Sequence, residues 1–109
     1  MKMLAFQNPK YPKEAILAQL KAHQAAEEIV KGQYWENGKG CAVGCTIHGA
    51  AHGKYESRFG IPAQLAHLED LIFEGLPNGE AKEWPLRFVR AIPEGVDLNG
   101  VWPAFAAWL

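Results

Sequence analysis

Both cysteines and two of the four histidines of this chain lie within the stretch GKGCAVGCTIHGAAHGKYE, residues 38–56. Side chains of this kind bind metal ions and act as acids, bases or nucleophiles. Steps of four and three residues return to the same side of an α-helix, because each residue turns by about 100°. The spacing therefore predicts a second helix in which one face carries Cys41, Cys45, His48, His52 and Glu56.

A metal site is one interpretation of this face. Four ligands along one helix would extend over about 16 Å at about 1.5 Å of rise per residue, so one tetrahedral ion cannot reach them all. One turn separates His48 from His52, so this pair is the predicted ligand pair, with Cys45 as a further ligand or thiol. The metal would be zinc or iron. Further ligands, or groups that orient the ligands, would come from Cys41, Glu56, His23, Glu27 and Glu69.

Two other interpretations of the same residues stay open. In a thiol redox site, a histidine lowers the pKa of one thiol and a second thiol resolves the intermediate. The order here, C-x-x-x-C-x-x-H, is similar to the helical C-x-x-C-x-x-x-H of the alkylhydroperoxidase D family, with different offsets. In a packing role, Cys41 and Cys45 would be small buried side chains, and Gly44 and Gly49 would let helices approach closely.

The remaining elements must position these groups. Pro12 followed by KEAILAQLKAHQAAEEIV predicts a long first helix over residues 13–30 that Gly32 ends. The stretch QYWENGKG, residues 33–40, is expected to be a loop around the Asn37-Gly38 turn. We expect Tyr34 and Trp35 in this loop to cover the cluster or to line the mouth of a pocket.

Two more helices are expected in the second half of the chain. Pro62 opens AQLAHLEDLIFEGL, whose core stripe would be Leu65, Leu68, Ile72 and Leu76, with Glu69 beside it. The stretch EAKEWPLRFVRAI carries a fourth helical pattern that Pro85 kinks or restarts. A buried Glu27, Glu56 or Glu69 would need a partner, for which the histidines or a metal are the candidates.

Strand signals are weak, and 109 residues suffice for one core. The expected fold is all-α, a compact single-domain helical bundle of four to five helices with irregular glycine- and proline-rich connections. Residues 1–10 are expected to be poorly ordered or extended.

Charge and composition exclude several function classes. The formal net charge is −1 and the basic residues are scattered, which argues against nucleic acid as a partner. The sequence has no apolar run of about eighteen residues and no signal segment, so we expect no membrane span and a cytoplasmic location.

The end of the chain is rich in large apolar side chains and would form a short helix. Trp102, Phe105 and Trp108 would either cap the core or form an interface in a homo-oligomer. The alternative to a metal or small-molecule site is therefore a non-catalytic interaction module that associates through this aromatic segment.

The stretches GKGCAVGCTIHG, KYESRFGIP and LAHLEDLIFEGLPNG and the later WP, within about residues 34–102, resemble a family of small uncharacterised bacterial and phage proteins. This resemblance implies a self-contained fold and brings no activity with it.

Overall fold

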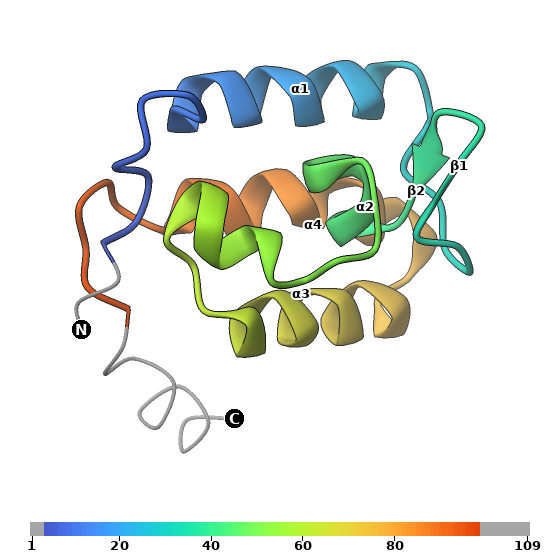
Figure 1. Ribbon diagram of the computed structural model, residues 1–109. Helices are drawn as coiled ribbons and strands as arrows, with labels where there is room; N and C mark the ends of the chain where they lie inside the picture. Colours follow the sequence, from blue (N-terminus) through green and yellow to red (C-terminus); the bar gives the residue numbers. More distant parts are fainter. Residues whose placement is uncertain (1–3, 99–109) are drawn as a thin grey trace.

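Five helices and one short hairpin make up the part of the chain that the computed structural model describes, residues 4–98 (Figure 1). The first helix, α1, is followed by a hairpin and a buried short helix, and a π-helix and two long helices complete the order. The elements are α1 (Lys13–Ala25), β1 (Trp35–Glu36), β2 (Lys39–Gly40), α2 (Ala42–Ile47), the π-helix η1 (Tyr55–Phe59), α3 (Ala63–Gly75) and α4 (Asn78–Ala91).

The short helix α2 lies at the centre of the molecule. It contacts α1, α3 and α4, and all six of its residues are buried. The longer helix α4 packs against both α1 and α3, so that α2 and α4 lie between these two outer helices (Figure 1). The largest fully buried side chains include Tyr55, Phe59, Phe73, Leu20 and Ile29. The fold is therefore largely helical, as predicted, with a small antiparallel hairpin in addition.

The first helix is shorter than predicted. It ends at Ala25, and Glu27 takes a left-handed backbone conformation with φ of 57°. The next residues pair with the chain near β2: the amide of Gly40 donates to the Glu28 carbonyl at 3.0 Å, and the amide of Val30 donates to the Gly40 carbonyl at 2.8 Å. The β-branched Ile29 and Val30 fit this extended pairing better than a helix end. The prediction of a helix over residues 13–30 was therefore wrong at its C-terminal end.

The predicted loop over residues 33–40 contains the hairpin of β1 and β2. Asn37 and Gly38 form its turn with φ of 54° and 77°, as a tight hairpin of right-handed twist requires. The Asn-Gly signal marked the turn, but the two-residue strands were too short to be recognised by alternation.

At two positions the nearby Tyr34 carbonyl leaves room only for glycine. A Cβ atom would lie 1.9 Å from this oxygen at Gly40 and 1.4 Å from it at Gly44. Gly44 therefore allows a close approach, as expected, although its partner is the backbone before the hairpin and not another helix. At Gly49 and Gly53 a Cβ would meet nothing within 4 Å.

The predicted second helix over residues 41–56 is not continuous. Cys41 caps α2, and its Sγ accepts a hydrogen bond from the Gly44 amide at 3.4 Å. The helix ends after Ile47, because His48 adopts a left-handed conformation with φ of 53°. A left-handed residue reverses the helical path, so the five reactive residues do not share one helix face.

The third helix is confirmed after Pro62, but its buried stripe is displaced. Leu65, Ala66, Glu69 and Phe73 are buried in α3. The side chains of Leu68, Ile72 and Leu76, which were predicted to lie in the core, are only half-buried. The fourth helix begins at Asn78, before the predicted start, and runs through Pro85 without a break in the assigned helix.

The two ends of the described chain run side by side. The Ala5 amide donates to the Val96 carbonyl at 2.9 Å, and the Gly95 amide donates to the Ala5 carbonyl at 2.8 Å. Ala5 and Phe6 are buried and belong to the core, whereas Leu4 is 41% exposed. The predicted terminal helix, with Trp102, Phe105 and Trp108, lies outside the described residues.

Within residues 4–98, the structure contains no helix with the length and apolar character needed to cross a bilayer.

Candidate functional site

Two histidines meet where α1 and α2 end. The His23 Nε2 and the His48 Nε2 are 2.8 Å apart, and the His23 Nδ1 is 2.8 Å from the Glu28 Oε1. The early end of α1 creates this geometry, since the Glu28 amide bonds back to the His23 carbonyl at 2.9 Å. We call these three residues the Glu28–His23–His48 series.

Trp35 from β1 holds the histidine rings. Its indole stacks on the His48 ring with centroids 4.2 Å apart and an angle of 12° between the planes. The same indole meets the His23 ring edge-on at 5.4 Å. Trp35 therefore covers the series, which is one of the two roles expected for it; the other was to line the mouth of a pocket.

When both imidazoles are neutral, the hydrogen-bond partners define where the protons of the series lie. A carboxylate only accepts, so the His23 Nδ1 donates to Glu28. A neutral His23 then has only an acceptor at Nε2, and the His48 Nε2 must donate to it. The His48 Nδ1 is left as an acceptor, and no residue between 4 and 98 bonds to it. The exposed end of the series is therefore a proton-accepting nitrogen.

The surroundings keep His48 neutral. Desolvation lowers the pKa of His48, and the nearby His23 and Arg58 lower it further, while Glu28 acts in the opposite direction. A neutral imidazole at physiological pH can accept a proton or bind a metal.

A cavity of about 280 Å³ opens beside His48. Arg58 lies over the Tyr11 ring at 5.0 Å and donates one hydrogen bond to the Ile47 carbonyl at 3.3 Å. Lys10 adds a second positive charge, and the described lining includes no carboxylate. The lining residues are Lys10, Tyr11, Ala15, Ile16, Gln19, Thr46, Ile47, His48, Arg58 and Phe59.

A second cluster lies on the other side of the hairpin. Tyr34 and Cys41 line a cavity of about 300 Å³ together with Asp70 and Glu74 of α3. Burial and the neighbouring Asp70 raise the pKa of Tyr34. Tyr34 thus lines a cavity, whereas its neighbour Trp35 covers the histidines.

His52 lies near this second cluster and apart from His48. Its ring stacks on the His67 ring with centroids 3.8 Å apart and meets the Tyr34 ring edge-on at 5.5 Å. Burial and the neighbouring His67 lower the pKa of His52. The predicted ligand pair is therefore divided, because His52 packs on α3 and His48 packs on Trp35.

Both cysteines are buried thiols with no disulfide between them. The Cys45 Sγ donates to the Gly40 carbonyl at 3.3 Å. Burial raises the pKa of both Cys41 and Cys45 to about 12. A reactive cysteine needs an accessible thiolate, so neither environment favours nucleophilic or redox chemistry.

Glu69 is buried, and its partner differs from the expected ones. Its side chain is 0% exposed, and the Tyr55 hydroxyl donates to its Oε1 at 2.7 Å. Burial raises the pKa of Glu69 to about 8. The partner that the structure gives the Glu69 Oε1 is therefore a tyrosine of η1 and not one of the predicted histidines.

The other predicted site residues are dispersed. The Glu56 carboxylate accepts a hydrogen bond from the Ala63 amide at 2.8 Å, at the start of α3. Glu27 is exposed on its left-handed turn. Among residues 4–98, no group of three histidine, cysteine, aspartate or glutamate side chains is arranged to hold a metal ion.

The sequence reasoning missed Glu28, Arg58 and Lys10. Glu27 was chosen because it continued the helical stripe, and the early end of α1 placed the next residue against His23 instead. No local pattern marks Arg58 or Lys10, since the folded chain alone brings them to His48.

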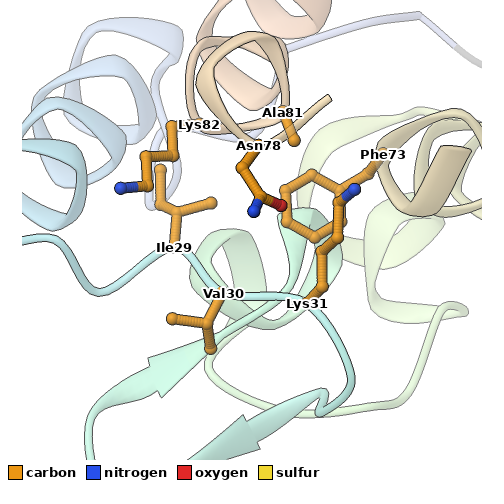
Figure 2. Close-up of a pocket in the computed structure, with 7 residues that line it drawn as sticks. All are labelled: Ile29, Val30, Lys31, Phe73, Asn78, Ala81 and Lys82. Carbon is orange, nitrogen blue, oxygen red and sulfur yellow. The ribbon is translucent and has the colours of Figure 1, made fainter. Parts of the chain in front are cut away.

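Figure 2 shows a further cavity, of about 230 Å³, between the extended residues 29–31 and the start of α4. Its apolar side is formed by Ile29 and Phe73. The Lys31 ammonium donates a hydrogen bond to the Leu76 carbonyl and so is already engaged at the C-terminal end of α3. The described lining has no histidine, cysteine or carboxylate, and the cavity offers little acid–base chemistry.

Comparison of the chain with protein-family models, with curated proteins and with solved structures found no match.

Proposed function

We propose that the cavity beside His48 binds a small anionic molecule and that His48 exchanges a proton with it. The observation that carries this proposal is the Glu28–His23–His48 series, whose free nitrogen belongs to a residue that lines a cavity with Arg58 and Lys10. A carboxylate that orients a histidine by a hydrogen bond is a typical arrangement in acid–base chemistry, and here a second histidine extends it to the cavity.

The anionic class of ligand follows from the charges of the lining. Arg58 and Lys10 are positive, and the described lining carries no negative side chain. Arg58 uses one nitrogen on the Ile47 carbonyl, and its planar group carries further donors that fit a carboxylate or phosphate. Such a ligand would lie within the same cavity as His48.

The proton would move along the series. A proton accepted at the His48 Nδ1 allows the Nε2 proton of His48 to pass to the His23 Nε2. The positive charge then rests on His23, next to the Glu28 carboxylate that its Nδ1 already contacts. Glu28 and His23 are positioning residues, and His48 is the residue that would touch the ligand.

Histidine-detected NMR tests this function, with inorganic phosphate and acetate as probes. Either anion should shift the His48 ring signals and raise the pKa of His48, because a nearby negative charge favours the imidazolium. Arg58→Gln should weaken the response. Arg90→Gln is the matched control, since Arg90 is exposed on α4 and removes the same charge elsewhere. Absence of a response to both anions, or an equal loss in both variants, would contradict the proposal.

A divalent transition metal between the two histidines is a second candidate. Two nitrogen ligands of a tetrahedral zinc ion lie about 3.3 Å apart at Zn–N distances of about 2.0–2.1 Å, close to the separation of the two Nε2 atoms. Glu28 would then orient His23 as carboxylates orient metal-binding histidines. The pair supplies only two ligands, so solvent or a ligand would complete the sphere.

Elemental analysis separates these two candidates. Protein purified without a histidine tag or chelator should carry about one equivalent of zinc or iron if the metal function is correct. This content should be lost in the His23→Gln variant and kept in the His67→Gln variant. Metal-free protein that still responds to phosphate would favour the acid–base function.

A further inference from the structure

An apolar groove runs between α3 and α4. It encloses about 330 Å³, and its lining within residues 4–98 is mostly apolar, with Arg87 as the one charged side chain there. The lining residues are Leu65, Leu68, Ile72, Trp84, Arg87, Phe88, Ala91, Ile92, Pro93, Val96 and Leu98. An opening of this size and character is in the range of sites that bind apolar groups.

The chain itself leads to this groove. The described chain ends at Leu98, which lines the groove, as does Val96. These residues are held in place, because Val96 accepts a hydrogen bond from Ala5 at 2.9 Å and Leu4 forms a bridge to Asp97. The remaining chain therefore starts at the groove, at a fixed point.

The following residues have the composition that the groove requires. The stretch NGVWPAFAAWL, residues 99–109, has no charged side chain. In a helical register, Trp102, Phe105 and Leu109 would share one face, as in helices that dock into apolar grooves. Eleven residues reach about 16 Å as a helix, which spans several turns of α3 or α4.

We infer that residues 101–109 of this same chain dock in the groove between α3 and α4, with Trp102 and Phe105 against Leu68 and Trp84. The segment would cover apolar side chains that the core leaves half-buried. A covalently attached segment has a high effective concentration at the groove, which favours it over a second copy or another apolar partner.

Hydrogen exchange of the full chain, followed by mass spectrometry, tests this inference. Amides of residues 104–109 should exchange more slowly than in the denatured chain. Leu68→Glu places a charge in the groove and should abolish this protection. Leu71→Glu is the matched control on the same helix, since Leu71 is 71% exposed and does not line the groove.

A variant in the segment tests the same contact from the other side. Phe105→Ser changes no described residue and should also abolish the protection. Cysteine labelling verifies the fold of each variant, because Cys41 and Cys45 are buried in the native chain.

Three results would overturn the inference. The first is exchange of residues 104–109 at the rate of the denatured chain, and the second is equal protection in the Leu68→Glu and Leu71→Glu variants. The third is a dimer in sedimentation experiments whose protection falls on dilution, which would place the segment of a second copy in the groove.

Discussion

At the scale of single residues, Glu69 is an ionisable side chain buried in the core. It is fully buried, and the Tyr55 hydroxyl satisfies only its Oε1, while its Oε2 has no partner among the described residues. An ionised carboxylate in this place would be strongly destabilising. Glu69 is therefore held as a neutral acid, which agrees with the rise of its pKa to about 8.

This burial predicts a pH dependence of stability. Between a pKa of 4.5 in the unfolded chain and about 8 in the folded one, only the folded chain keeps the Glu69 proton. The free energy of unfolding should therefore fall as the pH rises through this window. Glu69→Gln should flatten the dependence, as measured by urea unfolding between about pH 5 and about pH 8.

Glu74→Gln is the matched control for Glu69, because Glu74 is exposed on the same helix. It should keep the dependence of the unmodified chain. An equal slope in the Glu69→Gln variant would show that other groups cause the loss of stability.

A second prediction at this scale concerns the histidines. Glu28→Gln removes the carboxylate that favours the charged form of His48, so the pKa of His48 should fall further. NMR titration of the histidine rings measures this change. Glu27→Gln removes the same charge from the adjacent, exposed position and should leave the titration nearly unchanged. A similar shift in both variants would indicate a general charge effect without the specific contact.

At the scale of the elements, α2 depends on a contact with the chain before the hairpin. Its residue Gly44 lies so close to the Tyr34 carbonyl that a Cβ atom would be 1.4 Å from the oxygen. The three atoms nearest to this position all belong to the backbone of Tyr34 and Trp35, which cannot move aside as a flexible side chain would. The glycine is therefore required by packing and not by backbone conformation.

Gly44→Ala should destabilise the fold by about 3 kcal/mol or more, because α2 or the hairpin must shift to admit a methyl group. Gly49→Ala is the control, since a Cβ there meets nothing within 4 Å, and it should change stability little. Chemical denaturation of both variants provides the measurement. Equal midpoints would mean that the Tyr34 segment moves freely.

The sequence predicted best the elements that local signals define. Pro12 and Pro62 precede two helices that begin where expected, and Asn37-Gly38 marks a real turn. The sequence-based predictions failed where tertiary contacts determine the local conformation. The left-handed conformation of His48 and the pairing of Glu28 and Val30 with Gly40 interrupt the helical pattern, and no periodicity reports them.

The candidate site shows the same division. His23 and His48 were singled out by type, and the structure brings them together. The sequence paired His48 with His52 because it assumed one continuous helix. In the structure His48 contacts His23 instead of His52. This contact joins residues of two different helices, and the sequence pattern does not indicate which helices pack together.

At the scale of the whole molecule, the accessibility of the two cysteine thiols measures whether the core around α2 is closed. Both thiols are buried around α2, and their pKa values are raised to about 12. A thiol reagent at mildly alkaline pH should therefore label neither in the native chain and both in denaturant. Labelling should follow opening of the core, so its rate should increase in the Gly44→Ala variant.

Rapid labelling of Cys41 or Cys45 in the unmodified native chain would contradict this prediction. It would also return support to the redox interpretation, which needs an accessible thiolate.

Two successive residues of one strand segment serve opposite sides of the hairpin. Tyr34 belongs to the cavity with Cys41 and Asp70, and Trp35 stacks on His48. The peptide between them lies against Gly40 and Gly44, where an added Cβ atom would be 1.9 Å and 1.4 Å from the Tyr34 carbonyl oxygen. One backbone peptide therefore joins the residue stacked on His48 to the residue lining the second cavity, so a substitution that displaces this peptide, such as Gly44→Ala, is expected to disturb both places together.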